Sequence, residues 1–493
     1  MPKLIARSHN NRQTFSEYFH LGKQQHELDF VDIPINNGDI SLFIDPYALS
    51  KRNDRWSIEC HNFIVSFFQR VVDLIRAGQE RDAKYMLSGL KEPNQTRFGL
   101  SVGKLARGRG VSGSQAEALY EVLAESSAVK TGFLKDLEEC ELLIDGIGTD
   151  KISDITTNII RGKLIEYTQN QCSLWDVPMH DIPSGQIWDQ IENRWLSTYV
   201  PLPVCYEKSV LLVPKAIARF SLEFSHQEYY QHFVLNFIQE EHMSAGSSLV
   251  RVLKDGTRRP PTKKALKKLH PNSKQFLYSF SKDHPEVLKQ YRQSKTYKLS
   301  EIESEDINEL NKKRPEFDYD GLKAAFAKIN SGDADADKYH NHMVGALSAI
   351  FYPTLISPKK EQPIHGGRKK IDISFENAAK DGFFWTLPQN KQVPSSYIFI
   401  ECKNYSSDPA NPELDQLSGR FSTNRGKFGF LVCRRLSNKP RFIQRCKDTA
   451  QDGRGFIVVL DDSDIKKLLD FRKNNRIREL NDFLETEFKK LVM

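Results

Sequence analysis

The chain has 493 residues and a mass of 56.8 kDa, and 39% of its residues are hydrophobic and 27% charged. This composition predicts a globular protein of about two to four domains, and it excludes a wholly disordered chain, a collagen-like chain and a small disulfide scaffold. The net charge of +7 permits a nucleic-acid partner without requiring one. No apolar run approaches the roughly 20 residues of a spanning helix, so no membrane partner is expected.

The N-terminus and the cysteines both predict a cytoplasmic protein. The first residues lack the uninterrupted apolar stretch of a secretory signal. The seven cysteines contain no C-x-x-C pair and most have apolar neighbours, which predicts buried free thiols and argues against a disulfide framework or structural zinc.

Residues 1–245 alternate apolar, strand-like segments with amphipathic segments, which predicts a mixed α/β module with a recognition or regulatory role. Apolar residues at helical spacing or in short continuous runs mark its elements. We expect strands at 40–44 and 210–213, and helices at 61–77, 115–126, 154–167 and 227–241.

Residues 246–315 are basic and form the second zone. Asp255 is the only acid among the basic residues Arg251, Lys254, Arg258, Arg259, Lys263, Lys264, Lys267, Lys268 and Lys274. The segment is either a solvated linker with a lysine-rich helix or an arm that contacts phosphates. Closely spaced cations favour the second interpretation because they release counterions from nucleic acid, and we expect Lys263, Lys264, Lys267 and Lys268 to bind it.

Residues 316–493 predict one compact α/β domain with a mixed sheet and the element order α-β-β-α-β-β-α. The later strands are continuous apolar runs, as expected for strands that are covered on both faces. The predicted strands are 370–375, 397–403, 428–433 and 456–460, and the predicted helices are 339–351, 413–421 and 463–471.

Three charged residues in this domain form a candidate site. Because side chains alternate along a strand, Glu401 and Lys403 share one face, and pairing of the two strands places Asp372 beside Glu401. Two carboxylates and a backbone carbonyl suit Mg²⁺ or Mn²⁺, and the lysine can help to deprotonate a metal-bound water. The plainer alternative is an ion pair between Glu401 and Lys403 at the end of a strand.

The pattern resembles the PD-(D/E)xK nuclease superfamily, which has the restriction-endonuclease-like fold. The resemblance covers about residues 335–470 and depends on the strand ending in Ile-Asp-Ile (371–373) and on Glu-Cys-Lys (401–403). It implies that Asp372 and Glu401 hold the metal, that Lys403 serves the attacking water and that Gln416 supports them.

The sequence departs from the family pattern in two places. Residue 371 is Ile where the motif name has proline. The first helix has His340, Asn341 and His342 where many members carry a glutamate, so a histidine replaces that acid or the site works without it. Basic residues flank the same site and predict a phosphate-guiding rim, with a solvated surface as the alternative; these residues are Arg368, Lys369, Arg420 and Arg425.

The expected activity is hydrolysis of phosphodiester bonds by a Mg²⁺-dependent endonuclease that acts on DNA, with RNA left open. By analogy with the superfamily, the large second module implies a restriction enzyme or an effector in defence against phage. The alternatives are a nuclease of repair, recombination or transposition, and a non-catalytic nucleic-acid-binding protein. Cutting both strands needs two such sites, which favours a homodimer, and the second module favours an activating ligand or partner protein.

Overall fold

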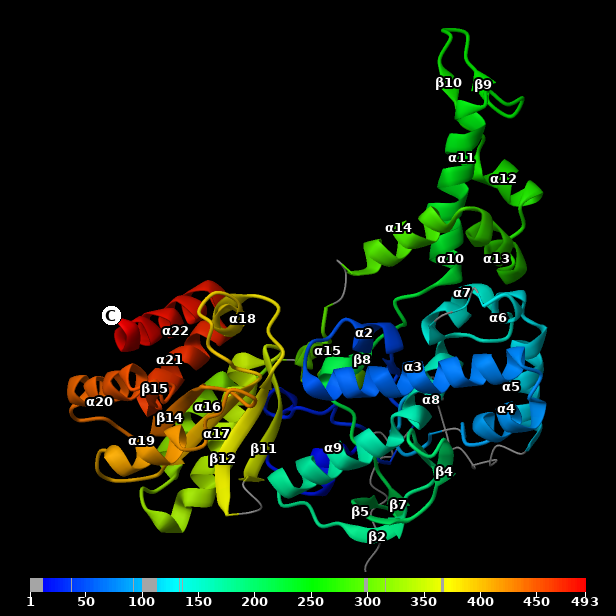
Figure 1. Cartoon of the computed structure of the whole chain (residues 1–493). Coiled ribbons are helices and arrows are strands. Elements are labelled where there is room, and N and C mark those ends of the chain that lie inside the picture. The colour runs from blue at the N-terminus through cyan, green and yellow to red at the C-terminus, as the bar shows by residue number, and fades with distance from the viewer. Residues whose placement is uncertain are drawn as a thin grey trace, which may run out of the picture.

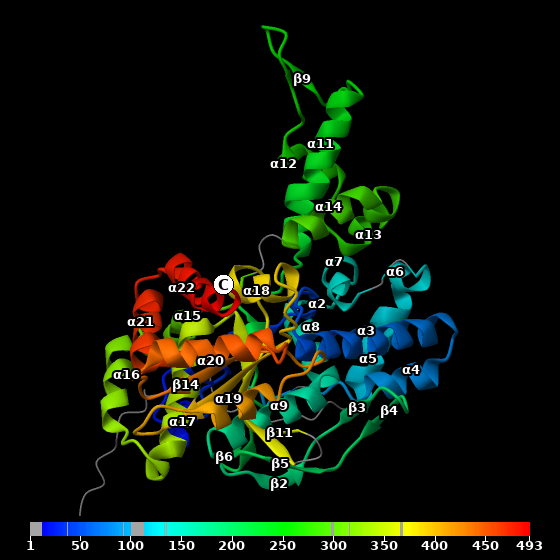
Figure 2. The ribbon, with the colours of Figure 1, turned by 60° about the vertical axis from the view of Figure 1, so that its left-hand side comes forward.

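The computed structural model describes residues 12–36, 38–91, 93–99, 113–132, 134, 136–296, 300–314, 316–364 and 368–493. Figures 1 and 2 show a C-terminal part built around a sheet, a largely helical N-terminal part beside it, and an arm that projects away from both. No helix in these ranges has the length and apolar character needed to cross a bilayer.

The C-terminal part is organised around one five-stranded mixed sheet, as the sequence predicts in outline. Its strand order is β11-β12-β13-β14-β15. The pairs β11/β12 and β12/β13 are antiparallel, and β13/β14 and β14/β15 are parallel. The strands are β11 (Leu355–Ile364), β12 (Lys369–Asn377), β13 (Tyr397–Lys403), β14 (Phe428–Cys433) and β15 (Phe456–Asp461).

Helices cover both faces of this sheet. Helix α17 (Ala336–Phe351) packs on one face, where Phe351 stacks on Phe430 of β14. Helix α19 (Asn411–Ser418) lies on the other, where Phe421, just after the helix, stacks on Phe399 of β13. The odd-numbered side chains of β13, including Glu401 and Lys403, therefore face α19. Around these lie α16 (Tyr319–Ala325), α20 (Lys439–Gln451), α21 (Asp462–Lys473) and α22 (Ile477–Val492).

The predicted order α-β-β-α-β-β-α is incomplete. The structure adds the edge strand β11, the helix α18 (Gly382–Gln389) between β12 and β13, α20 between β14 and β15, and the terminal α22. Parallel strands such as β14 and β15 require a crossover connection, and α20 supplies it. Strand β11 escaped detection because it contains Pro358, two lysines and a bulge between Ile356 and Lys359, so it lacks regular alternation.

The N-terminal part is more helical than the sequence predicts. Its sheets within the described residues have only two strands each. The helices include α2 (Pro46–Ser50), α3 (Arg55–Arg76), α4 (Glu80–Leu87), α5 (Gly113–Glu125), α8 (Thr149–Ile159) and α9 (Arg161–Leu174), and the strand pairs are β1/β8, β2/β5, β3/β4 and β6/β7.

Three expectations for this part need correction. Residues 210–213 are buried but form no strand, because their backbone groups pair singly with Pro203, Gln95 and Val31. The predicted strand at 40–44 shrinks to β1 (Phe43–Ile44). The single helix expected at 154–167 is two helices, α8 and α9, which meet at Ile160.

The N-terminal and C-terminal parts share one hydrophobic core. A continuous cluster joins Phe15, Leu28 and Leu174 to Ile373, Phe399 and Leu491. Polar contacts cross the same boundary: buried Asp29 accepts from Tyr167 Oη at 2.6 Å and from the Ser357 backbone N–H of β11 at 3.0 Å. The edge strand β11 is therefore covered by the N-terminal part, which protects an otherwise open sheet edge.

The basic zone at 246–315 is ordered and helical. After the hairpin β9/β10 come α12 (Lys263–Leu269), α13 (Lys274–Asp283), α14 (Pro285–Thr296) and α15 (Ser304–Leu310). Figures 1 and 2 show that the hairpin and α12 belong to the projecting arm, together with α11 (Leu235–Ser244), so this zone does not form an extended linker.

Candidate functional site at the end of β13

Strand pairing brings the two predicted carboxylates together. The last paired residues of β12 and β13 are Ile373 and Ile400, so Asp372 and Glu401 are the next residues on the two strands. The Cys402 backbone N–H donates to Asp372 Oδ2 at 3.2 Å, which holds the aspartate against β13. Lys403 Nζ lies 2.8 Å from Glu401 Oε1. The three residues of the predicted motif thus form one cluster.

Gln416 also joins this cluster, as the sequence predicts. It lies on α19, the helix that covers the Glu401 face of the sheet, and its Oε1 accepts from Lys403 Nζ at 3.4 Å. Helix α19 begins after Ala410 with Pro412 in its first turn, and the Glu413 carboxylate accepts from the Ala410 backbone N–H. This cap fixes the start of the helix and therefore the position of Gln416.

Arg420 lies inside the site rather than on an exposed rim. Its guanidinium forms an ion pair with Glu401 and approaches Asp372 Oδ1 at 3.9 Å, and its side chain is only 6% exposed. Burial lowers the pKa of Arg420, and the nearby Asp372 opposes that shift. The spacing of four residues from Gln416 is the sequence signal that would have placed both side chains on one side of this helix.

The Glu401 carboxylate is fully buried, and its charge is balanced by cations alone. Its side chain is 0% exposed and lies between Lys403 and Arg420. Neither of its oxygens has a hydrogen-bond partner of acceptable geometry among the described residues. A carboxylate in this situation requires nearby positive charge, because an uncompensated buried ion costs several kcal/mol.

His340 is the histidine that reaches the site from the first helix. Its Nε2 lies 3.1 Å from the Cys402 backbone oxygen, so this nitrogen carries the proton and donates. His342 points elsewhere, against the Phe326 ring, and Asn341 accepts from Lys360. Cys402 itself is no nucleophile, because burial raises the pKa of its thiol well above the ordinary value.

The other predicted phosphate-binding residues lie apart from this cluster. Arg368 is exposed at the start of β12, and the side chain of Lys369 lies outside the described residues. Arg425 is half-buried and donates to the Arg420 backbone oxygen at 3.1 Å, so it supports the loop after α19. Lys263, Lys264, Lys267 and Lys268 lie on α12 of the projecting arm.

The cluster has the oxygen ligands that a divalent cation prefers. Asp372 and Glu401 offer carboxylates, and the Cys402 carbonyl has a second lone pair free beside His340. Among the described residues no group of three or more His, Cys, Asp or Glu side chains is arranged to hold a metal. Mg²⁺ is compatible with this, since it commonly takes one or two carboxylates and retains water. The Arg420 guanidinium must move if an ion is to contact both carboxylates.

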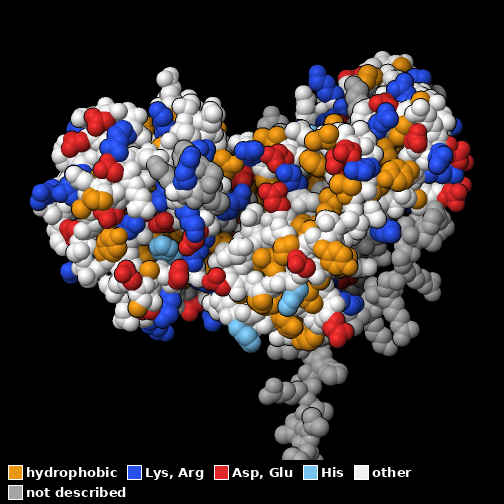
Figure 3. All heavy atoms as spheres, turned by 60° about the horizontal axis from the view of Figure 1, so that its bottom comes forward, with side chains coloured by type: hydrophobic (Ala, Val, Ile, Leu, Met, Phe, Trp, Pro, Cys, Tyr) orange, Lys and Arg blue, Asp and Glu red, His pale blue; other side chains and the backbone are white. Residues whose placement is uncertain are grey.

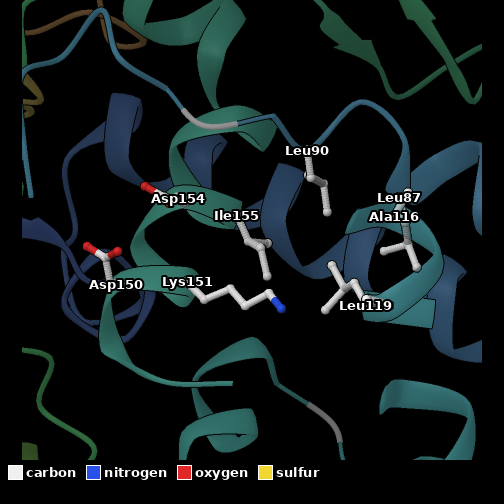
Figure 4. Close-up of a pocket in the computed structure, with 9 residues that line it drawn as sticks. Leu87, Leu90, Ala116, Leu119, Asp150, Lys151, Asp154 and Ile155 are labelled. Atoms are coloured by element: carbon white, nitrogen blue, oxygen red, sulfur yellow. The ribbon is translucent and has the colours of Figure 1, made fainter. Parts of the chain in front are cut away.

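A separate cavity of about 340 Å³ lies in the N-terminal part between α4, α5 and α8. Figure 4 shows Leu90, Leu119 and Ile155 facing one another across it, with the Lys151 ammonium reaching in beside Leu119. Asp150 and Asp154 also line it. Its walls are mainly apolar, so it does not resemble the site at β13.

Comparison with known proteins identifies only part of the chain. Residues 20–225 match a family model described as a domain of unknown function (DUF8370). No curated protein and no solved structure matches the chain. The matched segment covers the N-terminal part and ends before the projecting arm and the site at β13.

Proposed function

We propose that the C-terminal part is a metal-dependent nuclease of the PD-(D/E)xK type that hydrolyses phosphodiester bonds in DNA. The observation that carries the proposal is the juxtaposition of Asp372, Glu401 and Lys403 on neighbouring strands, with Gln416 in contact with the lysine. The mixed sheet supports it, because the aspartate strand lies beside the Glu-Cys-Lys strand and helices pack on both faces.

In this proposal Asp372, Glu401 and the Cys402 carbonyl hold Mg²⁺ or Mn²⁺. A bound divalent ion would polarise a phosphoryl oxygen and lower the pKa of a water molecule. Lys403 Nζ contacts Glu401 and Gln416, so both orient the ammonium, which accepts or donates a proton near the attacking water. The Arg420 guanidinium supplies positive charge where negative charge increases on the phosphoryl group.

A second candidate is a non-catalytic nucleic-acid-binding domain with the same architecture. One observation favours it: Lys403 and Arg420 already neutralise Glu401, so the buried carboxylate has counter-charges without a metal. In that case the site would stabilise the fold and DNA would bind elsewhere on the surface. A nuclease of repair or transposition would have the same chemistry as a defence enzyme, so the two differ only in biological setting.

The deciding experiment is cleavage of plasmid and linear DNA by the full chain with Mg²⁺, with Mn²⁺ and with EDTA. We expect metal-dependent cutting that falls by at least about 100-fold in Lys403→Ala, because proton transfer typically contributes that much. Lys489→Ala removes an exposed lysine of α22 and should cut like the wild type. Cutting that survives Lys403→Ala would contradict this assignment, and DNA binding without any cutting would favour the second candidate.

A further inference from the structure

The projecting arm has a defined stem and a β-hairpin at its tip. The stem runs through α10 (His226–Glu228), the π-helical turn η4 (Tyr229–Val234) and α11. The hairpin pairs β9 (Arg251–Val252) with β10 (Arg258–Arg259), and Figures 1 and 2 show it at the far end of α11, away from the rest of the molecule.

The positive charge of the protein is concentrated on this arm. Residues 246–270 contain eight lysines and arginines and one acid, which equals the net charge of +7 carried by the whole chain. The remaining residues are therefore balanced, and Figure 3 shows acidic and basic side chains interspersed over the face it presents. The described structure gives none of the eight cations an ion pair with an acidic side chain.

The hairpin keeps like charges side by side. Arg251 and Arg259 are direct cross-strand partners and share one face, while Arg258 is paired with Val252 on the other. Like charges directly opposite one another destabilise a two-stranded ribbon, which is already marginal in water. A polyanion contacting this ribbon would remove that repulsion.

Apolar side chains are exposed among these cations. Val252 is 66% exposed and Leu253, at the turn, is 37% exposed. The turn itself is tight: Leu253 N–H donates to Thr257 O, and Gly256 has a φ of +82°. The tip of the ribbon therefore presents a narrow apolar edge flanked by Lys254 and the arginines.

The stem holds the hairpin and α12 in a fixed relation. Gln239 Nε2 donates to Pro261 O at 2.6 Å, and Lys263 Nζ donates to Gln231 O at 2.7 Å. Leu266 of α12 is buried against this stem, whereas Lys264, Lys267 and Lys268 are exposed. Lys263 therefore has a structural role, and the other three α12 lysines are available to a ligand.

We propose that this arm inserts its β-ribbon into the major groove of duplex DNA, with the α12 lysines on the flanking phosphates. A two-stranded ribbon fits the major groove of B-form DNA, and exposed aliphatic side chains suit thymine methyl groups. The deep, narrow major groove of RNA excludes such a ribbon. The choice of DNA rests on the proposed nuclease function, but the binding itself requires neither metal nor catalysis.

The test measures binding of the full chain to a fluorescent DNA duplex in EDTA, where cutting cannot occur, at several salt concentrations. In the triple variant Arg251→Ala, Arg258→Ala, Arg259→Ala we expect at least a tenfold loss of affinity. The slope of log affinity against log salt should fall by about three, since each lost phosphate contact removes about 0.9. In Val252→Ser, Leu253→Ser we expect weaker binding with an unchanged slope, because no charge is removed.

The matched control removes the same charge elsewhere. Arg70, Arg81 and Arg478 are exposed and lie outside the arm, so their triple alanine variant should bind like the wild type. Circular dichroism confirms that each variant is folded. The proposal is overturned if the wild type does not bind duplex DNA, if the arm and control variants lose affinity equally, or if single-stranded RNA competes as well as duplex DNA. Loss of binding in the arm variant without any cutting by the wild type would remove the nuclease and leave the arm's role intact.

Discussion

At the scale of single residues, the balance of charge around Glu401 is the main energetic feature of the candidate site. The carboxylate is fully buried, and Lys403 and Arg420 are the cations beside it. Arg420 also approaches Asp372, so this guanidinium occupies the space between the two carboxylates where a divalent ion would bind. Arg420 is therefore both a stabilising partner of the apo site and a competitor of the metal.

Replacing Arg420 by Gln should separate these two effects. Without metal, we expect the free energy of unfolding to fall by about 3 kcal/mol, because a buried carboxylate loses one of its counter-ions. Added Mg²⁺ should restore more stability to the variant than to the wild type, since binding to the folded state alone stabilises it. Chemical denaturation with and without Mg²⁺ measures both effects.

Arg441→Gln is the control for this comparison, because Arg441 is exposed on α20. It should leave both the stability and the Mg²⁺ response unchanged. A Mg²⁺ response of equal size in Arg420→Gln and the wild type would show that the guanidinium does not compete with the metal.

At the scale of elements, the close approach of β13 and β14 determines where the site lies. Phe399 is paired with Gly429, and a Cβ added at Gly429 would lie 2.6 Å from the Phe399 backbone oxygen and 3.2 Å from the Phe421 ring. Phe421 also stacks on Phe399. Glycine at this position therefore lets α19 and its following loop approach the strand that carries Glu401.

Gly429→Ala should lower the free energy of unfolding by about 1–3 kcal/mol, the usual range for overpacking a core. The clash is with backbone, which cannot rotate away. Gly148→Ala is the matched control, because nothing lies within 4 Å of its added Cβ and its φ of −116° suits alanine. Urea denaturation of both variants decides the point, and equal stabilities would contradict the packing argument.

At the scale of the whole molecule, the boundary between the N-terminal part and the sheet is buried and polar as well as apolar. Glu376 of β12 accepts from the Trp56 backbone N–H of α3 at 3.3 Å. Burial raises the pKa of Glu376 to about 7; Asp54 raises it further, and Lys359 and the Trp56 N–H oppose the shift. An ionised Glu376 is therefore unfavourable at this interface.

This pKa gives a pH dependence with a definite sign. Since the folded value lies above the unfolded one, the contribution of Glu376 favours the fold below about pH 4.5 and is lost as pH rises through about 7. Glu376→Gln should therefore be more stable than the wild type by up to about 3 kcal/mol near pH 8, with little difference near pH 5. Unfolding curves at both pH values test this. Glu240→Gln, at an exposed position of α11, should show no such pH-dependent gain.

Short-range patterns in the sequence determined much of the C-terminal part. The strand bounds predicted for 397–403 and 428–433 are those observed, because continuous apolar runs between turn residues have few other local structures available. The period of two along a strand placed Glu401 and Lys403 together, and the resemblance pointed to Asp372 and Gln416. The structure brings all four residues into one cluster, and their catalytic roles stay predictions.

Only the tertiary structure decided the features that depend on distant segments. Strand β11 has an irregular pattern and is stabilised by its contacts with β12 and with the N-terminal part. Arg420 was predicted as a surface cation, and its burial follows from α19 packing over Glu401. The basic residues of 246–270 were visible in the sequence, but their presentation on a stem is not a local property. Charge and periodicity are encoded locally, whereas burial and partner choice depend on which segments meet in space.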